Sequence, residues 1–395
     1  MGGRRLTEFD TVINRRGTCC AKWDLHAEKG IPEDALPLWV ADMDFPAPEA
    51  VTEALIERAK HGIFGYSVPS SEFHASVVNW MLDRHNWQIE PEWIVSAPGV
   101  VPALNFAIQA YTKEGDGVLI QNPVYPPFTN SVVNNNRKLV NNPLIIKDGR
   151  YYIDFDDFEA KIVANKVKLF LFCSPHNPVG RVWSRKELET LGDICLKHNV
   201  IVVSDEIHQD FVFPGSKHLP LPLVKKEFGK NTLVCTAPSK TFNVAGLQAS
   251  NIIIPDPDLR EQFSQAYAVA GLGLLNTFGM VACEAAYTHG SQWLDNVIAY
   301  VEVNADFAME FIAEHLPQLK VIKPEGLYLL WIDCAGLGLA PEELENFLLE
   351  KARLWLNQGY TFGEEGAGYV RLNIACPRSV LKKALVQLKH AVDSR

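Results

Sequence analysis

Long hydrophobic runs are absent from the sequence. No apolar run approaches the roughly 18 residues that a membrane-spanning helix needs. The first ten residues, MGGRRLTEFD, also lack the apolar stretch of a signal peptide. We therefore expect no membrane association and a cytoplasmic location.

An excess of positive charge is absent too. Lys and Arg total 37 against 47 Asp and Glu, which gives a formal net charge of −10. Proteins that grip nucleic acid or anionic lipid need clustered positive charge, and no block of about five or six like charges occurs. Nucleic acid and membranes are therefore not expected among the partners.

The eight cysteines form no C-x-x-C pair and no zinc-type spacing. Cys173 in LFLFC and Cys235 in TLVCT lie inside apolar runs. We interpret the cysteines as small buried hydrophobes in a reducing compartment, and we expect no metal site.

The overall composition is that of an ordinary globular protein, with 47% hydrophobic and 21% charged residues. The 395 residues are enough for two or three domains at about 150 residues each. No internal repeat or low-complexity tract is visible. Intrinsic disorder and a disulfide-built miniature fold are therefore excluded.

Short apolar runs alternate with longer segments of helical period. Most of the short runs are continuous rather than alternating, as in strands that are covered on both faces. Strands are expected over 118–121, 168–173, 200–204, 232–236 and 251–254, with another near 327–333. Helices are expected over 48–61, 71–85, 101–112 and 293–315.

One further helix lies between two of these strands. Ser184 and Glu187 form a capping-box start, and a helical stretch continues through His198. Strand, helix and strand in that order make a βαβ crossover, which predicts a parallel sheet. We expect an α/β fold with a large domain over 45–281, whose mostly parallel central sheet is covered by helices. A smaller α+β domain would combine 1–44 with 282–395.

Polar residues follow directly on several of the expected strands. These segments are SPHNPVG (174–180), DEIH (205–208), PSKTFN (238–243) and APGVV (97–101). Ligands of open parallel sheets bind outside the carboxyl ends of the strands. Asn177, Asp205 and Lys240 are therefore expected to converge at one edge of the sheet.

Each of these residues has an ordinary explanation when taken alone. Asn177 could belong to a structural Asn-Pro turn, and Asp205 could end a strand and cap the next element. Lys240 could be a solvated surface lysine, and His208 a hydrogen-bonded core histidine. The joint pattern of a carboxylate, an Asn-Pro turn and a Ser-Lys pair at successive strand ends instead indicates a pyridoxal phosphate (PLP) site.

On this pattern the chain resembles the PLP-dependent fold-type I aminotransferase superfamily, and within it the cystathionine β-lyase, or C–S lyase, branch. The matching stretches run in the family's order over nearly the whole chain. They are LWVADMDF (38–45), PGVV (98–101), CSPHNPVGR (173–181), SDEIH (204–208), APSKTFN (237–243) and VRLN (370–373).

The resemblance implies roles for the residues around the cofactor ring. Lys240 would hold PLP as a Schiff base and, once freed, act as the general base at the substrate Cα. Asp205 would keep the pyridine nitrogen protonated. Asn177 would hydrogen-bond the phenolic oxygen of the ring, with His208 beside it. Tyr125 would stack on the ring face.

The resemblance also implies which residues bind the cofactor phosphate and the substrate's α-carboxylate. Backbone N–H groups at Gly99, Val100 and Val101, before a helical run, and the hydroxyl of Ser239 would bind the phosphate. Tyr66 would reach the phosphate of a neighbouring subunit, which implies a homodimer. Its other explanation is a buried tyrosine after a helix.

Arg371 would grip the substrate's α-carboxylate, although a surface ion pair is its alternative explanation. Some close relatives carry a second tyrosine where this chain has Pro126, so a contact made by that extra hydroxyl is not expected here.

The leading functional expectation is a PLP-dependent β-elimination lyase. It would release thiol, pyruvate and ammonia from L-cystathionine or a cysteine S-conjugate, a sulfur amino acid substrate that suits methionine biosynthesis and amino-acid metabolism. An aminotransferase on the same scaffold is the first alternative, since fold and cofactor do not fix the reaction. A regulatory protein that retains the enzyme fold is the second.

Overall fold

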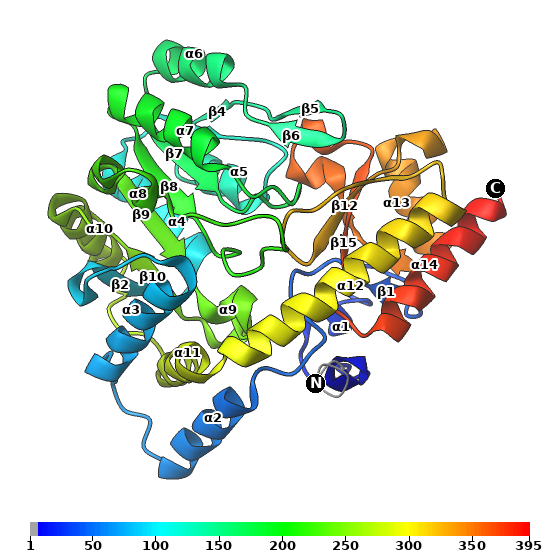
Figure 1. Ribbon diagram of the computed structural model, residues 1–395, viewed down its shortest axis with the longest axis horizontal. Helices are drawn as coiled ribbons and strands as arrows, with labels where there is room; N and C mark the ends of the chain where they lie inside the picture. Colours follow the sequence, from blue (N-terminus) through cyan, green and yellow to red (C-terminus); the bar gives the residue numbers. More distant parts are fainter. Residues whose placement is uncertain (1–6) are drawn as a thin grey trace.

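A seven-stranded sheet forms the centre of the larger part of the molecule (Figure 1). The computed structural model describes residues 7–395. Residues 1–6, which begin the MGGRRLTEFD segment, lie outside the described residues. Across the sheet the strands follow the order β2 (Ile94–Ala97), β10 (Ser250–Ile253), β9 (Thr232–Thr236), β8 (Ile201–Asp205), β7 (Val167–Cys173), β3 (Gly117–Ile120) and β4 (Lys138–Asn141).

The sheet is mostly parallel, as the βαβ pattern predicts. Strands β9, β8, β7, β3 and β4 run parallel to one another, whereas β10 runs antiparallel to both β9 and β2. The five strands expected between 118 and 254 are present within one residue at each end.

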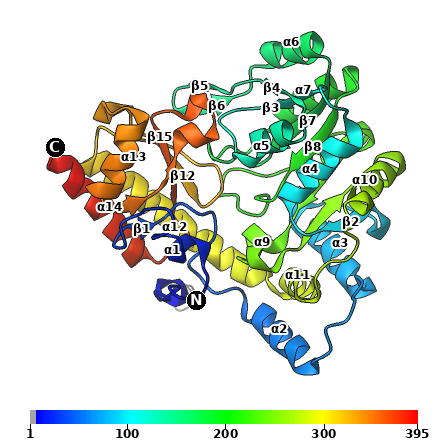
Figure 2. The ribbon, with the colours of Figure 1, turned by 180° about the vertical axis from the view of Figure 1, so that it is seen from behind.

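Helices cover both faces of this sheet. Alternate strand side chains point to opposite faces, so one core joins Val118, Leu169 and Val203 to α4 (Val100–Tyr111), α5 (Pro127–Asn134) and α10 (Pro257–Val269). The opposite core joins Phe170 and Val202 to α6 (Phe155–Asn165), α7 (Arg185–Lys197) and α8 (Leu221–Val224). Helix α7 lies over the sheet in Figure 1 and α4 lies over its other face in Figure 2.

The remaining helices surround the sheet and the C-terminal part. They are α1 (Ala21–Asp24), α2 (Glu49–His61), α3 (Ser71–His85), α9 (Pro238–Thr241), α11 (Thr277–His289), α12 (Ser291–His315), α13 (Pro341–Glu350) and α14 (Arg378–Asp393). All five helices expected from the sequence are present within two residues at each end. Helix α7 begins with the expected capping box of Ser184 and Glu187.

A second, antiparallel sheet of four strands lies in the C-terminal part. Its order is β11 (Lys320–Ile322), β12 (Leu329–Asp333), β15 (Tyr369–Asn373) and β14 (Asn357–Gln358). Strand β1 (Leu36–Pro37) pairs with β13 (Leu354–Trp355), so the N-terminal segment joins this C-terminal part. Strands β5 (Ile145–Lys147) and β6 (Arg150–Tyr152) form a separate hairpin. The domain boundaries at residues 45 and 281 stay a prediction.

Six of the eight cysteines are buried as free thiols, as expected of small hydrophobes in a core. Cys19 is exposed and Cys20 is half-buried, so these two do not follow that expectation. Within residues 7–395, no helix combines the length and apolar character needed to cross a membrane.

Candidate active site

A cavity of about 340 Å³ opens where β7 and β8 end and where α9 follows β9. Its lining includes nine of the predicted site residues: Val100, Val101, Tyr125, Asn177, Asp205, His208, Ser239, Lys240 and Arg371. The carboxyl ends of the parallel strands meet at one edge of the central sheet and bring eight of these residues together, whereas Arg371 comes from β15 of the antiparallel sheet. Tyr66 is the exception and lies fully exposed in the segment between α2 and α3.

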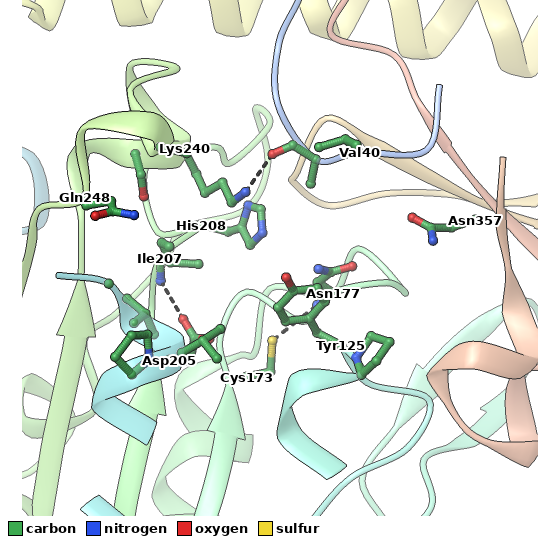
Figure 3. Close-up of a pocket in the computed structure, with 18 of the residues that line it drawn as sticks. Val40, Tyr125, Cys173, Asn177, Asp205, Ile207, His208, Lys240, Gln248 and Asn357 are labelled. Atoms are coloured by element: carbon green, nitrogen blue, oxygen red, sulfur yellow. Dashed lines mark hydrogen bonds between the residues drawn. The ribbon is translucent and has the colours of Figure 1, made fainter. Parts of the chain in front are cut away.

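Lys240 points into this cavity from the single-turn helix α9 (Figure 3). Its Nζ donates a hydrogen bond to the carbonyl oxygen of Ala41 at 2.7 Å. Burial, reinforced by the positive charge of Arg371, lowers the pKa of the Lys240 ammonium to about 8. A usable fraction of this amine is therefore neutral near physiological pH, as a proton acceptor requires.

Asp205 is the last residue of β8 and lies at the floor of the cavity. Its Oδ1 accepts a hydrogen bond from the backbone N–H of Ile207 at 3.1 Å, which Figure 3 shows as a dashed line. Burial raises the pKa of the Asp205 carboxyl to about 7, against the smaller opposing effects of that hydrogen bond and of Lys240. A cationic ligand group placed beside Asp205 would restore its ionised form.

Arg371 lies in β15 and is only 3% exposed. Its guanidinium donates to the side-chain oxygens of Asn177 at 3.0 Å and Asn357 at 2.5 Å, and to the carbonyl of Trp39 at 2.8 Å. None of these partners is charged, and its Nε has no partner among the described residues. Burial therefore lowers the pKa of Arg371 to about 10, and the site can accept a carboxylate.

Asn357, Trp39 and Phe362 also line the cavity but were not predicted as site residues. Asn357 stands opposite Arg371 in the β14–β15 pairing, and the ring of Phe362 lies 5.0 Å from the guanidinium carbon. Pairing between strands could not be read from the sequence. Only the position of Trp39 within the LWVADMDF stretch carried a signal.

His208 and Tyr125 occupy the same cavity as Asn177. His208 is buried, and burial together with the charges of Lys240 and Arg371 holds its pKa well below the usual range, so the ring is neutral. Burial raises the pKa of the Tyr125 hydroxyl, which stays protonated. Pro126 lines the cavity beside Tyr125 and brings no hydroxyl there.

Helix α4 begins at Val100, with Gly99 as its N-cap residue. The first backbone N–H groups of a helix have no partner within the helix and attract anions. Gly99, Val100, Val101 and Ser239 all line the cavity, so this helix start faces the ligand space. A side chain at position 99 would bring its Cβ within 3.3 Å of the Pro102 ring.

The LWVADMDF stretch is held against the cavity by two asparagines. Asn243 donates to the carbonyls of Met43 and Phe45 at 2.9 and 2.8 Å. Asn373 donates to the carbonyls of Val40 and Asp42, each at 2.6 Å. The asparagines that end the APSKTFN and VRLN motifs therefore fix the segment whose Ala41 carbonyl receives Lys240.

The residues present fit PLP and an amino acid. Among residues 7–395, no cation contacts the buried carboxyl of Asp205, which suits a protonated pyridine nitrogen. Lys240 is a half-buried amine that suits the aldehyde, and the start of α4 suits the phosphate. The buried guanidinium of Arg371 has no carboxylate partner in the same part of the chain and suits the α-carboxylate of a substrate.

The chain is similar to known proteins in both sequence and structure. The family model for "Aminotransferase class I and II" matches residues 33–388. Cystathionine beta-lyase PatB from Bacillus subtilis is 48% identical over 385 residues, covering 98% of this chain and all of that protein.

Two solved structures are similar along nearly the whole chain. Cystalysin from Treponema denticola, which contains a pyridoxal 5'-phosphate cofactor, has 39% identity and a TM-score of 0.95 over 98% of both chains. The PLP-bound C-S lyase from Staphylococcus hominis has 34% identity and a TM-score of 0.91 over 97% of both chains. With its matching model, its fold and its pocket, the chain belongs to the class I and II aminotransferase family.

Proposed function

We propose that the protein is a PLP-dependent carbon–sulfur β-lyase of the cystathionine β-lyase type. The observation that carries this proposal is one cavity lined by two buried ionisable groups, Asp205 and Arg371, and the half-buried Lys240, none of which has a contacting partner of opposite charge within the described residues. The names of PatB and of the Staphylococcus C-S lyase support the same reaction. Free buried thiols fit a reducing compartment, and we place the enzyme in the cytoplasm.

In this proposal the cavity residues hold the cofactor. Lys240 would carry it covalently, Asp205 would pair with the pyridine nitrogen, and the backbone at Val100 and Val101 would bind the phosphate with help from Ser239. Tyr125 would stack on the ring, and Asn177 would hydrogen-bond the phenolic oxygen with His208 beside it. When bound, PLP supplies an electron sink for the charge left at the substrate Cα.

The protein's own residues then handle the substrate. Arg371 binds the α-carboxylate and orients the amino acid, and the neutral Lys240 amine takes the proton from Cα. Loss of the thiol from Cβ and addition of one water give one pyruvate, one ammonium and one free thiol for each substrate. No oxidant or reductant is needed.

The first experiment is a turnover assay without any keto acid. L-cystathionine is mixed with the purified holoenzyme, and pyruvate and free thiol are followed together. Equal and sustained release of both is expected. Transamination would give neither product, but it would form glutamate once 2-oxoglutarate is added as amino acceptor.

We also propose a homodimer in which Tyr66 completes the site of the neighbouring subunit. Tyr66 is fully exposed in the segment between α2 and α3, which projects from the body in Figure 1. Ile63, Phe64 and Val68 of the same segment are more than half exposed, at 68, 57 and 72%. Such an apolar surface is typical of a contact between subunits.

Complementation tests the shared site directly. Tyr66→Ala and Lys240→Ala variants are each expected to be nearly inactive. If the sites are shared, mixing them under subunit exchange restores part of the activity, because one mixed site regains both residues. A mixture that exchanges subunits and stays inactive would contradict the role of Tyr66.

A further inference from the structure

The loop that follows β8 also carries a polar side chain, Asp210, that lies outside the active-site cavity. Asp205 and His208 face the active-site cavity, whereas Asp210 does not line it. Asp210 Oδ1 accepts hydrogen bonds from Trp80 Nε1 at 3.2 Å and His85 Nε2 at 2.8 Å. These two donors come from α3, so Asp210 ties the active-site loop to that helix.

The other oxygen of Asp210 binds the residue next to Lys240. Oδ2 accepts a hydrogen bond from the Thr241 hydroxyl at 2.7 Å, and the side chains of both residues are buried. Thr241 and Asp210 are absent from the cavity lining, so a substrate in the cavity would not touch them. Any effect of this contact on the reaction must therefore pass through the backbone of α9.

Helix α9 depends on such contacts because it has only four residues. A single helical turn is not stable by itself, since few internal hydrogen bonds offset the loss of backbone freedom. Two side-chain anchors follow Lys240 in the chain: Thr241 binds Asp210, and Asn243 binds the backbone of Met43 and Phe45.

The Asp210 carboxyl is held in its ionised form. Burial alone would raise the pKa of its carboxyl, but the hydrogen bond and charge of His85, with the Thr241 hydroxyl, outweigh burial and lower that pKa. An ionised carboxylate with three donors has a fixed orientation.

We propose that Asp210, oriented by His85 and Trp80, is a positioning residue that sets the direction of Lys240 through Thr241. This inference rests on the proposed role of Lys240. A misplacement of about 1 Å at a reacting group can cost a large factor in rate, so loss of the anchor is expected to act on turnover more than on substrate binding.

The test compares Thr241→Val with Thr241→Ser in the holoenzyme. Valine keeps the shape of threonine but removes the hydroxyl that reaches Asp210, whereas serine keeps the hydroxyl. We expect kcat of Thr241→Val to fall about tenfold or more, with KM nearly unchanged. Thr241→Ser should recover most of the loss, and Asp210→Asn should resemble Thr241→Val.

A measurement without turnover separates positioning from stability. Visible circular dichroism of the bound cofactor reports its orientation, so it should change in Thr241→Val and return in Thr241→Ser. Thr112→Val is the matched control, because the buried Thr112 hydroxyl accepts a hydrogen bond from Arg137 Nε at 2.9 Å but makes no hydrogen bond to α9 and does not line the cavity.

The outcomes are distinguishable. If Thr241→Val only lowers the unfolding temperature and keeps wild-type kcat and dichroism, the contact is structural and the inference is wrong. If wild-type protein binds no PLP or releases no pyruvate and thiol, the proposed function fails instead.

Discussion

Asp205 and Asp210 stand at the two ends of one short loop and are buried to the same degree, 6 and 7% exposed. Their pKa values nevertheless move in opposite directions. Asp210 has three side-chain donors and a lowered pKa, whereas burial raises that of Asp205, which has only a backbone N–H at 3.1 Å, to about 7. Partners, and not burial alone, decide whether a buried carboxyl is ionised.

The cations show the same contrast. Lys22 is completely buried, and its Nζ lies 2.9 Å from Asp44 and 3.5 Å from Asp42. Arg371 is also buried and Lys240 is half-buried, but the hydrogen bonds of both go to neutral oxygens. The ion pairs of Lys22 stabilise the fold. Lys240 and Arg371 have no carboxylate partner among the described residues, so each can bind a ligand group of opposite charge.

The largest expected effect is at Lys240. Lys240→Ala should lower turnover by about 10³-fold or more, because no other amine lines the described cavity to take the Cα proton. It should also remove the absorbance of covalently held cofactor while circular dichroism shows an intact fold. Lys225→Ala, which breaks an ion pair with Asp193 (2.6 Å) near the surface, is the control. Full turnover with the absorbance retained would refute the assignment.

Asp205→Asn tests, in cofactor-free protein, the buried carboxyl that lacks a cationic partner among the described residues. The unfolded chain releases this proton near pH 4, but the folded protein keeps it up to about pH 7. Wild-type stability should therefore fall as pH rises from 4 to 7, by about 4 kcal/mol at most, and then level off.

Denaturant titrations at several pH values measure this dependence. Asp205→Asn should show a smaller fall over the same pH range. Equal pH dependence of the two proteins would mean that Asp205 is not the group responsible.

Arg371→Ala should act mainly on substrate binding. Loss of a charged hydrogen bond to the α-carboxylate is expected to raise KM about tenfold to hundredfold. Cofactor content, measured by absorbance after gel filtration, should change little. Arg150→Ala removes a partly exposed ion pair with Glu325 and serves as the control. If Arg371→Ala instead strips the cofactor, the arginine is structural.

The complete pair between His218 and Glu206 should respond differently. His218→Ala leaves Glu206 Oε2 buried without this donor, which should cost about 1–3 kcal/mol of unfolding free energy. Turnover should stay close to wild type because neither residue lines the cavity or makes a hydrogen bond to α9 or Asp210. Denaturant titration and kcat measured on the same preparation check this prediction. A large loss of kcat at unchanged stability would contradict it, because paired groups would then affect turnover as unpaired groups do.

Much of the site was predictable from the sequence because parallel strands end at one edge. Asn177, Asp205, His208 and Lys240 follow β7, β8 and β9 directly, so local strand patterns were enough to bring them together. Tyr66 differs because its proposed contact lies in another subunit.

The rest depended on contacts between distant segments. Asn357 reaches Arg371 only through pairing of β14 with β15, and Thr241 reaches Asp210 across 31 residues. Apolar periodicity carries no information on which polar atoms will meet.

The sequence by itself determined five strands of the central sheet, five of the helices and the identities of the chemical groups, because short-range patterning of apolar and polar residues indicates secondary structure. Only the tertiary structure decided which of those groups remain without a partner. Ionisation depends on the distance of each charge from every other group around it, and folding alone sets those distances.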